Sequence, residues 1–316
     1  MLNPYVFIVG CPRSGTTLLR RIVSAHPQIV ITPEAHWIPL WFAERRGLTP
    51  DGLVTPELIP ALLAHDKFAM FGLGPDELTS LAGRGQQISF ASFVTGIFDL
   101  YGKARGKELV GNKTPDSARR MDTLHALWPR ARFLHLIRDG RDVALSLMNW
   151  PKVRNKTPGK LPTWKEDPVS TSALWWELNV RRSREAGKLL GSQLYREFRY
   201  ESLLAHPDQV CAELCEFLGL PYDEAILHYH EASEKDRPGV EAGHDREPIT
   251  PGLRNWKTQM SAEDVEHFEA AAGALLDELN YPRAFARLGT AAVEQSARIR
   301  TLLAGALPSI RAYRAV

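Results

Sequence analysis

The residues best suited to hold an anion lie near the start of the chain, where a short apolar run passes into a loop and then into a helical pattern. The apolar run ends at Val9, Gly10 and Gly15 bracket the loop, and helical spacing begins at Thr16. Glycines allow unusual backbone angles and close approach of a ligand, and the N–H groups at a helix start attract negative charge. Three hydroxyl groups add hydrogen-bond donors: Ser14, Thr16 and Thr17. The pattern predicts a phosphate-binding loop.

This loop differs from the loop of nucleoside triphosphatases at one decisive position. In the pattern G-x-x-x-x-G-K-[ST] a lysine follows the second glycine, whereas this chain has Thr16 there. The basic residue lies inside the loop instead, as Arg13, whose planar guanidinium can bind two oxygens of a terminal phosphate or sulfate group. The missing lysine disfavours a P-loop kinase.

A second group of polar residues follows another apolar run, residues 132–137. Arg138 comes directly after this run, and Ser146 lies eight residues further on, about two turns into the next expected helix. Open α/β sheets bind ligands beyond the carboxyl ends of their strands, so Arg138 is placed to meet an anion. The intervening charged turn is also able to form an ion-pair network, in which Arg141 either assists or is structural.

A carboxylate and an imidazole follow the apolar run at residues 29–32. Glu34 and His36 lie just beyond its carboxyl end and would face the same crevice as the glycine loop. Transfer of a charged group to a hydroxyl needs a base for the proton and cations for the growing negative charge. On these grounds either residue can be the base.

These side chains need a scaffold that gathers strand ends, and the rest of the sequence predicts one. Strand-like runs alternate with helical patterns, which predicts parallel βαβ units and an α/β fold, a P-loop-like doubly wound sheet, mainly parallel, flanked by helices. The expected strands are residues 5–9, 29–32, 108–110, 132–137 and 194–200, and the longest expected helices are 171–190 and 261–279, with Ser261 as N-cap. Residues 1–285 are expected to form one domain and residues 286–316 a C-terminal helical extension.

Together, the two anion-binding patterns resemble those of sulfotransferases that use 3'-phosphoadenosine 5'-phosphosulfate (PAPS). The sequence Pro-Arg-Ser-Gly-Thr-Thr at residues 12–17 looks like the family's 5'-phosphosulfate loop, in the arginine form of many bacterial members and of protein-tyrosine sulfotransferases. Arg138 and Ser146 resemble its 3'-phosphate motif, an arginine followed eight residues later by a serine. The resemblance runs from Val6 to about Tyr281. It implies transfer of a sulfuryl group from PAPS to a hydroxyl or amine by in-line displacement, leaving 3',5'-adenosine bisphosphate.

Further roles come only from this resemblance. Glu34 lies where tyrosine sulfotransferases have their general base, so Glu34 is the expected base and His36 the substitute. Lys113 lies in a Lys-x-Pro element and is expected to stabilise charge on the leaving phosphate oxygen, alongside Arg13. Three residues are expected to contact the cofactor elsewhere: Tyr200 near the adenosine, and Arg254 and Lys257 in a late segment that closes over it.

Composition bounds the compartment and the partners. The 39 Lys and Arg residues against 37 Asp and Glu give a net charge of +2, too small to indicate a nucleic-acid partner. No apolar stretch approaches the roughly 20 residues that span a bilayer. Only three cysteines and no visible export signal favour the cytoplasm. His228 and His230 lack further ligands at metal spacing, so no metal site is expected.

The acceptor is expected to be selected by three loops, residues 35–47, 66–87 and 150–168. Their tryptophans, phenylalanines and prolines favour a small molecule, a lipid or a glycoside over a highly charged polysaccharide. A peptide tyrosine and a homo-oligomeric state stay open. The alternative functions are a P-loop kinase, a nucleotide-binding protein without sulfuryl transfer, and a non-catalytic anion-binding module.

Overall fold

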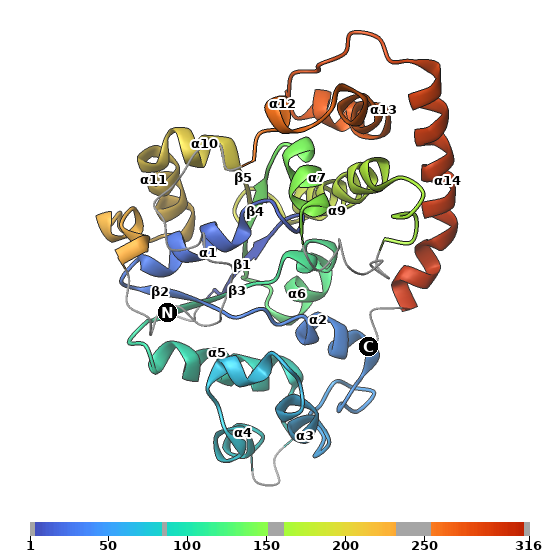
Figure 1. The fold of residues 1–316 in the computed structure, drawn as a ribbon. Coiled ribbons are helices and arrows are strands. Elements are labelled where there is room, and N and C mark those ends of the chain that lie inside the picture. The colour runs from blue at the N-terminus through green and yellow to red at the C-terminus, as the bar shows by residue number, and fades with distance from the viewer. Residues whose placement is uncertain (1–3, 84–86, 151–160, 232–253, 313–316) are drawn as a thin grey trace. The chain divides into compact units, whose positions relative to one another are not determined.

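The computed structural model describes residues 4–83, 87–150, 161–231 and 254–312, with side chains up to residue 306 (Figure 1). The described residues form two compact units. The first takes its residues from 1–10, 15–136 and 183–250, and the second from 11–14, 137–182 and 251–316. In the described part of the chain, no helix combines the length and the apolar character needed to cross a membrane.

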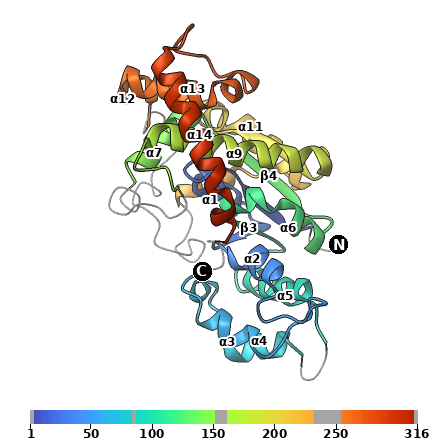
Figure 2. The ribbon, with the colours of Figure 1, turned by 90° about the vertical axis from the view of Figure 1, so that its right-hand side faces the viewer.

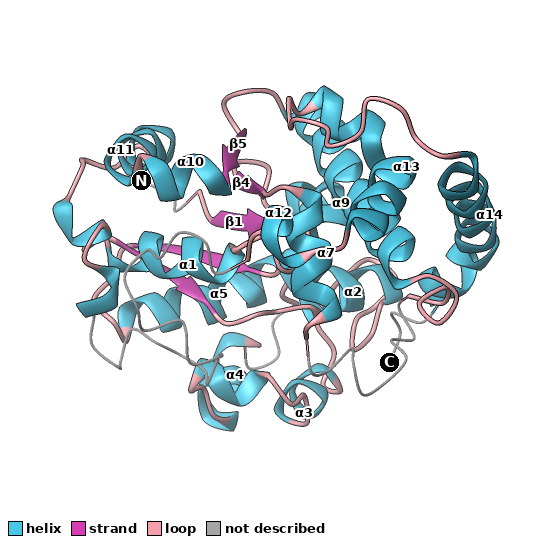
Figure 3. Cartoon of the chain, turned by 45° about the horizontal axis from the view of Figure 1, so that its top comes forward, coloured by secondary structure: helices cyan, strands magenta, loops and turns pink. Residues whose placement is uncertain are grey.

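A five-stranded sheet organises the first unit (Figure 3). Its order is β2-β3-β1-β4-β5, and the pairs β1–β3, β1–β4 and β2–β3 are parallel. The strands are β1 (Val6–Val9), β2 (Ile29–Thr32), β3 (Leu109–Lys113), β4 (Arg132–Ile137) and β5 (Tyr195–Arg199). The predicted mainly parallel α/β sheet is confirmed.

Both faces of β1 and β2 are buried, which explains why these strands are continuous apolar runs. Alternate residues of β1 enter different hydrophobic clusters. Phe7 stacks on Phe133 of β4 with ring centroids 5.5 Å apart. Val6 and Ile8 pack instead in the cluster that contains Leu134. Strand β1 is therefore a central strand, and the loop that follows it begins at a residue buried in the core.

Helices supply the rest of these two clusters. The cluster that contains Val6 and Ile8 also includes side chains of five helices: α1 (Thr16–Ala25), α10 (Tyr200–Ala205), α11 (Pro207–Leu218), η3 (Glu224–Ile226) and η4 (Tyr229–Glu231). The cluster that contains Phe7 includes side chains of seven helices: α2 (Trp37–Glu44), α3 (Leu58–Leu63), η1 (Phe68–Phe71), α4 (Pro75–Leu81), α5 (Phe90–Lys103), η2 (Pro115–Arg119) and α6 (Met121–Leu127). Figure 1 shows α1 and α5 on opposite sides of β1, as in a doubly wound sheet.

The second unit is helical and has its own core. It contains α7 (Gly140–Met148), α12 (Trp256–Gln259), α13 (Ala262–Glu278), α14 (Thr290–Ala312) and residues 168–182 of α9 (Pro168–Leu190). The rings of Trp176 and Phe268 meet with centroids 5.9 Å apart. As predicted, Ser261 caps α13 by accepting a hydrogen bond from the N–H of Asp264. Helix α14, which lies beside α13 in Figure 2, buries Ile299 in this core.

Two predicted strand boundaries were wrong, and each matters for a candidate residue. Strand β3 continues to Lys113 because Gly111 and Lys113 still pair with β1, so Lys113 is the last residue of the strand and not part of a following loop. Strand β5 ends at Arg199, and Tyr200 begins α10 instead of ending the strand.

Two of the three segments expected to be acceptor loops contain helices. Residues 35–47 contain α2, and residues 66–87 contain η1 and α4. Four aromatic side chains of these segments are buried in the core: Trp37, Trp41, Phe68 and Phe71. Their presence therefore does not support an apolar acceptor. Residues 84–86 of the second expected loop and residues 151–160 of the third lie outside the described residues.

Candidate functional site

Every strand of the sheet ends in, or leads directly to, a residue predicted to bind or react. The glycine loop follows β1, Glu34 follows β2, Lys113 ends β3, Arg138 follows β4 and Tyr200 follows β5. Residues 11–14 of the loop and Arg138 belong to the second unit, and the others belong to the first. The candidate residues therefore form two groups, one in each unit.

The first group is centred on the carboxylate of Glu34. Lys113 donates to Glu34 Oε1 at 2.8 Å. Lys67 and His36 both contact the other oxygen, Oε2, the His36 Nε2 atom at 3.1 Å. Lys113 also donates to Thr17 Oγ1 at 3.3 Å, which links this group to the first turn of α1. The structure thus brings four predicted residues together and adds Lys67 to them.

The surroundings of Glu34 favour its ionised form. Burial raises the pKa of this carboxyl group, but the hydrogen bond from His36 and the charges of Lys113 and Lys67 outweigh burial. The resulting pKa lies well below the ordinary range of glutamate. Glu34 is therefore a carboxylate held between cationic groups.

A buried polar network fixes the segment that carries Glu34. The Asn112 side chain in β3 donates to Thr32 Oγ1 at 2.8 Å and to the Pro33 carbonyl at 2.7 Å. Thr114 Oγ1 accepts from the N–H of Ala35 at 2.8 Å. Since β2 and β3 are neighbours in the sheet, these bonds hold the residue after β2 against the end of β3. This is why Glu34 and Lys113 meet.

Gly15 begins α1 in a conformation that only glycine adopts easily. Its φ of 91° lies in the left-handed region, and an added Cβ atom would lie 2.5 Å from the Tyr200 ring. The structure therefore places Tyr200 directly against the glycine loop. Thr16 and Thr17 form the first turn of α1.

We expect Gly15→Ala to destabilise the protein more than Gly72→Ala. Both glycines have positive φ, 91° and 69°, but an added Cβ meets nothing within 4 Å at Gly72. Positive φ costs alanine about 1–2 kcal/mol, and the clash with Tyr200 adds about 1–3 kcal/mol at Gly15 alone. Urea unfolding of the two variants measures the difference. Equal losses would show that Tyr200 moves away without cost.

The second group begins with Arg13, which lies in the loop with a left-handed φ of 76°. Its Nε atom donates to Ser146 Oγ at 3.1 Å, and its guanidinium carbon lies 5.4 Å from the centroid of the Trp150 ring. The Ser14 side chain is 1% exposed, and its hydroxyl has no hydrogen-bond partner among the residues that the structure describes. A strained arginine and an unsatisfied buried hydroxyl are typical of a ligand site.

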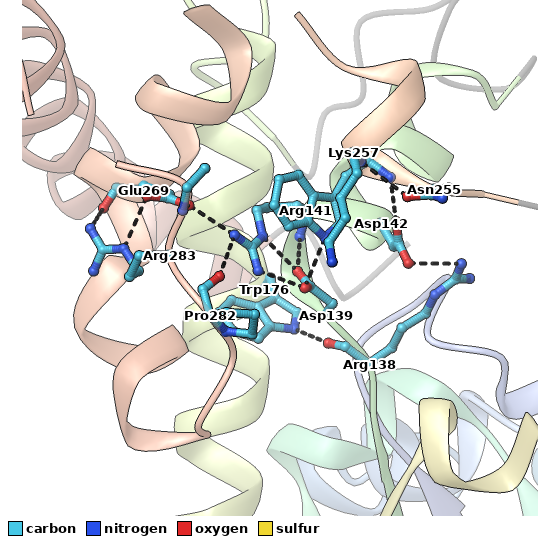
Figure 4. Close-up of polar contacts among 12 residues, drawn as sticks. Arg138, Asp139, Arg141, Asp142, Trp176, Asn255, Lys257, Glu269, Pro282 and Arg283 are labelled. Carbon is cyan, nitrogen blue, oxygen red and sulfur yellow. Dashed lines mark hydrogen bonds and ion pairs between the residues drawn. The ribbon is translucent and has the colours of Figure 1, made fainter. Parts of the chain in front are cut away.

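Arg138 is held at the start of α7 by contacts from several elements (Figure 4). Its guanidinium lies 3.4 Å from Asp142 Oδ2, and its carbonyl accepts from the Trp176 indole at 3.1 Å. The other oxygen of Asp142 accepts the backbone N–H of Trp256 at 2.9 Å. Burial raises the pKa of Asp142 against the opposing charge of Arg138. Asp142 thereby joins Arg138 to the start of α12.

Arg141 has a structural role, which resolves the two interpretations left open by the sequence. Its side chain is 0% exposed and pairs with Asp139 and Glu269, each at 2.8 Å. The guanidinium also lies 3.7 Å from the centroid of the Trp256 ring, which donates to Asp139 through its indole N–H. These contacts fix the turn between β4 and α7, from which Arg138 extends.

The late basic residues lie at the start of α12. Arg254 precedes α12 and Lys257 lies in it, and both side chains are exposed. The lysine N–H donates to Asn255 Oδ1 at the N-cap. Their predicted contact with a cofactor stays a prediction.

Glu231 lies beside the two histidines for which the sequence analysis found no further ligand. The ligand atoms of His228, His230 and Glu231 lie within 4.8 Å of one another. Glu231 pairs with the histidines at 3.4 Å and 3.7 Å, and it is largely exposed.

Sequence reasoning missed Lys67, Asp142 and Trp256. Lys67 lies within an expected acceptor loop, but a single lysine carries no pattern that distinguishes it from a solvated one. Asp142 was visible only as part of a charged turn. A sharper signal exists for Trp256, since an aromatic residue between Arg254 and Lys257 suggests an anchor for that basic segment.

Comparison with known proteins identifies relatives over most of the chain. A family model described as "Sulfotransferase family" matches residues 4–224. Protein-tyrosine sulfotransferase A of Caenorhabditis elegans is 26% identical over 284 residues, 88% of this chain and 67% of the relative. The nodulation protein NoeE of Sinorhizobium fredii is 27% identical over 291 residues, 87% of this chain and 65% of the relative. The Drosophila melanogaster protein-tyrosine sulfotransferase is matched over 52% of its length. The chain thus spans about half to two thirds of these relatives.

Solved structures share the fold. The sulfotransferase domain of the Synechococcus PCC 7002 olefin synthase superposes with a TM-score of 0.57 at 21% identity, covering 94% of each chain. The sulfotransferase domain of the curacin biosynthetic pathway gives a TM-score of 0.54 at 18% identity, covering 96% of this chain and 98% of the other.

Proposed function

Because the chain belongs to the sulfotransferase family, we propose that it transfers a sulfuryl group from PAPS to a hydroxyl or amine of an organic acceptor. The observation that carries the proposal is the contact of the Glu34 carboxylate with Lys113, which also bonds Thr17 at the start of α1. A carboxylate that could accept a proton and a buried cation thus lie together at the start of the helix that follows the glycine loop. A kinase would need neither this arrangement nor Thr16 in place of the loop lysine.

The residues present suit a donor with phosphate and sulfate groups. The buried Ser14 hydroxyl without a partner in the described part of the chain can donate to an anion. Gly15 keeps side-chain atoms away from the helix start. We propose that the 5'-phosphosulfate is bound by Arg13, Ser14, Gly15, Thr16 and Thr17, and the 3'-phosphate by Arg138 and Ser146. Tyr200 would contact the adenosine. Arg254 and Lys257 would belong to a segment that closes over the donor.

In this proposal the donor supplies a sulfuryl group whose bond to the bridging phosphate oxygen breaks as the acceptor oxygen bonds to sulfur. Glu34 takes the proton of the acceptor hydroxyl. Lys113, which is 2% exposed, stabilises the negative charge that develops on the leaving oxygen, because a charge in a water-poor site acts strongly. Arg13 binds the transferring group and limits its movement.

Calorimetric titration tests the donor. We expect 3',5'-adenosine bisphosphate to bind without a metal ion and more tightly than ATP with magnesium. A preference for magnesium ATP would contradict the proposal and return the chain to the kinases.

We expect Arg138→Ala to weaken binding of 3',5'-adenosine bisphosphate by about 10- to 100-fold, the usual effect of one hydrogen bond to a charged group. Adenosine 5'-phosphate, which has no 3'-phosphate, is the matched ligand and should bind the variant and the parent protein alike. The two titrations are compared at one salt concentration. Equal losses for both ligands would show that Arg138 acts on the fold and not on the 3'-phosphate.

The names of the relatives support a proposal about the class of acceptor. We propose a hydroxyl group on a small molecule, a lipid, a glycoside or a peptide tyrosine. Transfer of ³⁵S-labelled sulfuryl groups to panels of phenols, glycosides, lipids and tyrosine peptides would distinguish them. Incorporation into none of the four panels, with tight binding of the bisphosphate, would favour a nucleotide-binding protein without sulfuryl transfer.

A further inference from the structure

The contacts of Glu34 are difficult to reconcile with a base that is ready to act. A general base works best when its pKa is near the working pH and when one lone pair points at the proton. Here both carboxylate oxygens already accept hydrogen bonds, from Lys113 on Oε1 and from Lys67 and His36 on Oε2. If Glu34 is the base, as the proposed function requires, Oε2 can receive the proton only after one of its two partners has left, because each carboxylate oxygen has two lone pairs.

The two oxygens of the carboxylate differ in how easily the lysine bound to each can leave. Lys113 is 2% exposed, lies in a central strand and also bonds Thr17. Lys67 is 42% exposed. Moving an exposed ammonium into water costs little, whereas taking a buried lysine away from its carboxylate leaves an uncompensated buried charge. Oε2 is therefore the oxygen that can be uncovered.

The backbone around Lys67 is nevertheless well anchored. The residue immediately precedes η1, whose Phe68 and Phe71 side chains are buried and stacked with centroids 5.4 Å apart. Its N–H donates to His65 Nδ1 at 3.3 Å. A fixed backbone with an exposed side chain gives an ammonium group that can leave Glu34 and return to the same place.

The other polar side chains around Glu34 have further partners of their own. His36, on the same segment, faces Asp116 of η2 through its second nitrogen at 3.9 Å. Asp116 is itself paired with Arg119 at 3.0 Å. His36 is thus held between two carboxylates, while Lys113 is held between Glu34 and Thr17. Lys67 is the exposed lysine of this group.

We propose that Lys67 is a positioning residue that holds Glu34 Oε2 when no acceptor is present, and that the acceptor hydroxyl replaces it there, so that Oε2 receives the proton. The transferred proton moves from the acceptor oxygen to Oε2, and Lys67 moves toward solvent. Loss of one positive charge beside the carboxylate raises the pKa of Glu34 when the acceptor arrives. Glu34 is thus kept ionised at rest and becomes more basic in the reactive complex.

The first test is infrared difference spectroscopy at neutral pH on protein labelled with ¹³C-glutamate. The Glu34 carboxylate band is identified by subtracting the spectrum of Glu34→Gln. We expect the band to shift in Lys67→Met, to return toward its original position in Lys67→Arg, and to stay unchanged in Lys103→Met, which removes an exposed lysine of α5 and thus the same charge. An unchanged band in Lys67→Met would overturn the proposal.

The second test separates this proposal from the proposed function. Release of 3',5'-adenosine bisphosphate from PAPS, with water as the acceptor, is followed against pH. Removing Lys67 should move the acid limb of the profile to higher pH by about one to three units, because Glu34 loses one of the charges that depress its pKa. If the band shifts in Lys67→Met while the profile stays in place, Lys67 is a partner of Glu34 but Glu34 is not the base. If neither changes, Lys67 has no role at Oε2.

Discussion

Replacing Glu34 with glutamine is expected to lower the rate of sulfuryl transfer by about 100- to 10,000-fold, the usual contribution of a general base. Glutamine keeps the size of the side chain, but its single carbonyl oxygen can accept from only one of Lys113 and Lys67, and its amide group cannot take a proton. Affinity for 3',5'-adenosine bisphosphate should not change, because no assigned phosphate contact is removed. Calorimetry and the rate of bisphosphate release from PAPS measure the two quantities.

The matched control is Glu44→Gln, which changes an exposed carboxylate at the end of α2. It should retain both turnover and affinity. Thermal unfolding of both variants is needed, because Glu34→Gln leaves the buried Lys113 without its carboxylate. Full turnover in Glu34→Gln would discard Glu34 as the base, and His36→Gln would then be the next variant.

Replacing Arg141 with methionine is expected to destabilise the second unit by about 3–5 kcal/mol, the usual cost of removing one partner from a buried ion pair. The arginine is 0% exposed and bonds Asp139, Glu269 and the Pro282 carbonyl. Methionine fills part of the volume but leaves both carboxylates with fewer donors. Urea unfolding followed by tryptophan fluorescence measures the loss, since Trp256 packs on the guanidinium.

Arg181→Met is the matched control for this prediction. Arg181 pairs with Glu177 and Glu278 in the same unit but is 36% exposed. An exposed pair contributes about 0–1 kcal/mol, so this variant should unfold close to the parent protein. Similar losses in the two arginine variants would mean that burial of Arg141 has no energetic consequence, and the turn that carries Arg138 would then need another explanation.

Much of the fold could be predicted from local sequence. The central strands are buried on both faces, so each is a short apolar run that is visible without any partner. The glycines of the first loop are determined by backbone angles that only glycine adopts easily, as at Gly15. Boundaries were less certain, since the end of β3 at Lys113 depends on its pairing with β1 and not on its own residues.

The sequence by itself therefore determined the order of strands along the chain and the polar residue that follows each of them. Only the tertiary structure decided which side chains meet. Lys113 lies 79 residues from Glu34, Lys67 lies 33 residues from it, and Trp256 lies 114 residues from Asp142. Such contacts depend on the lateral order of the sheet and on how helices pack, and they leave no periodic pattern in the sequence. For this reason Glu34 could be named as a candidate base from the sequence, whereas the lysine that contacts its second oxygen could not be named.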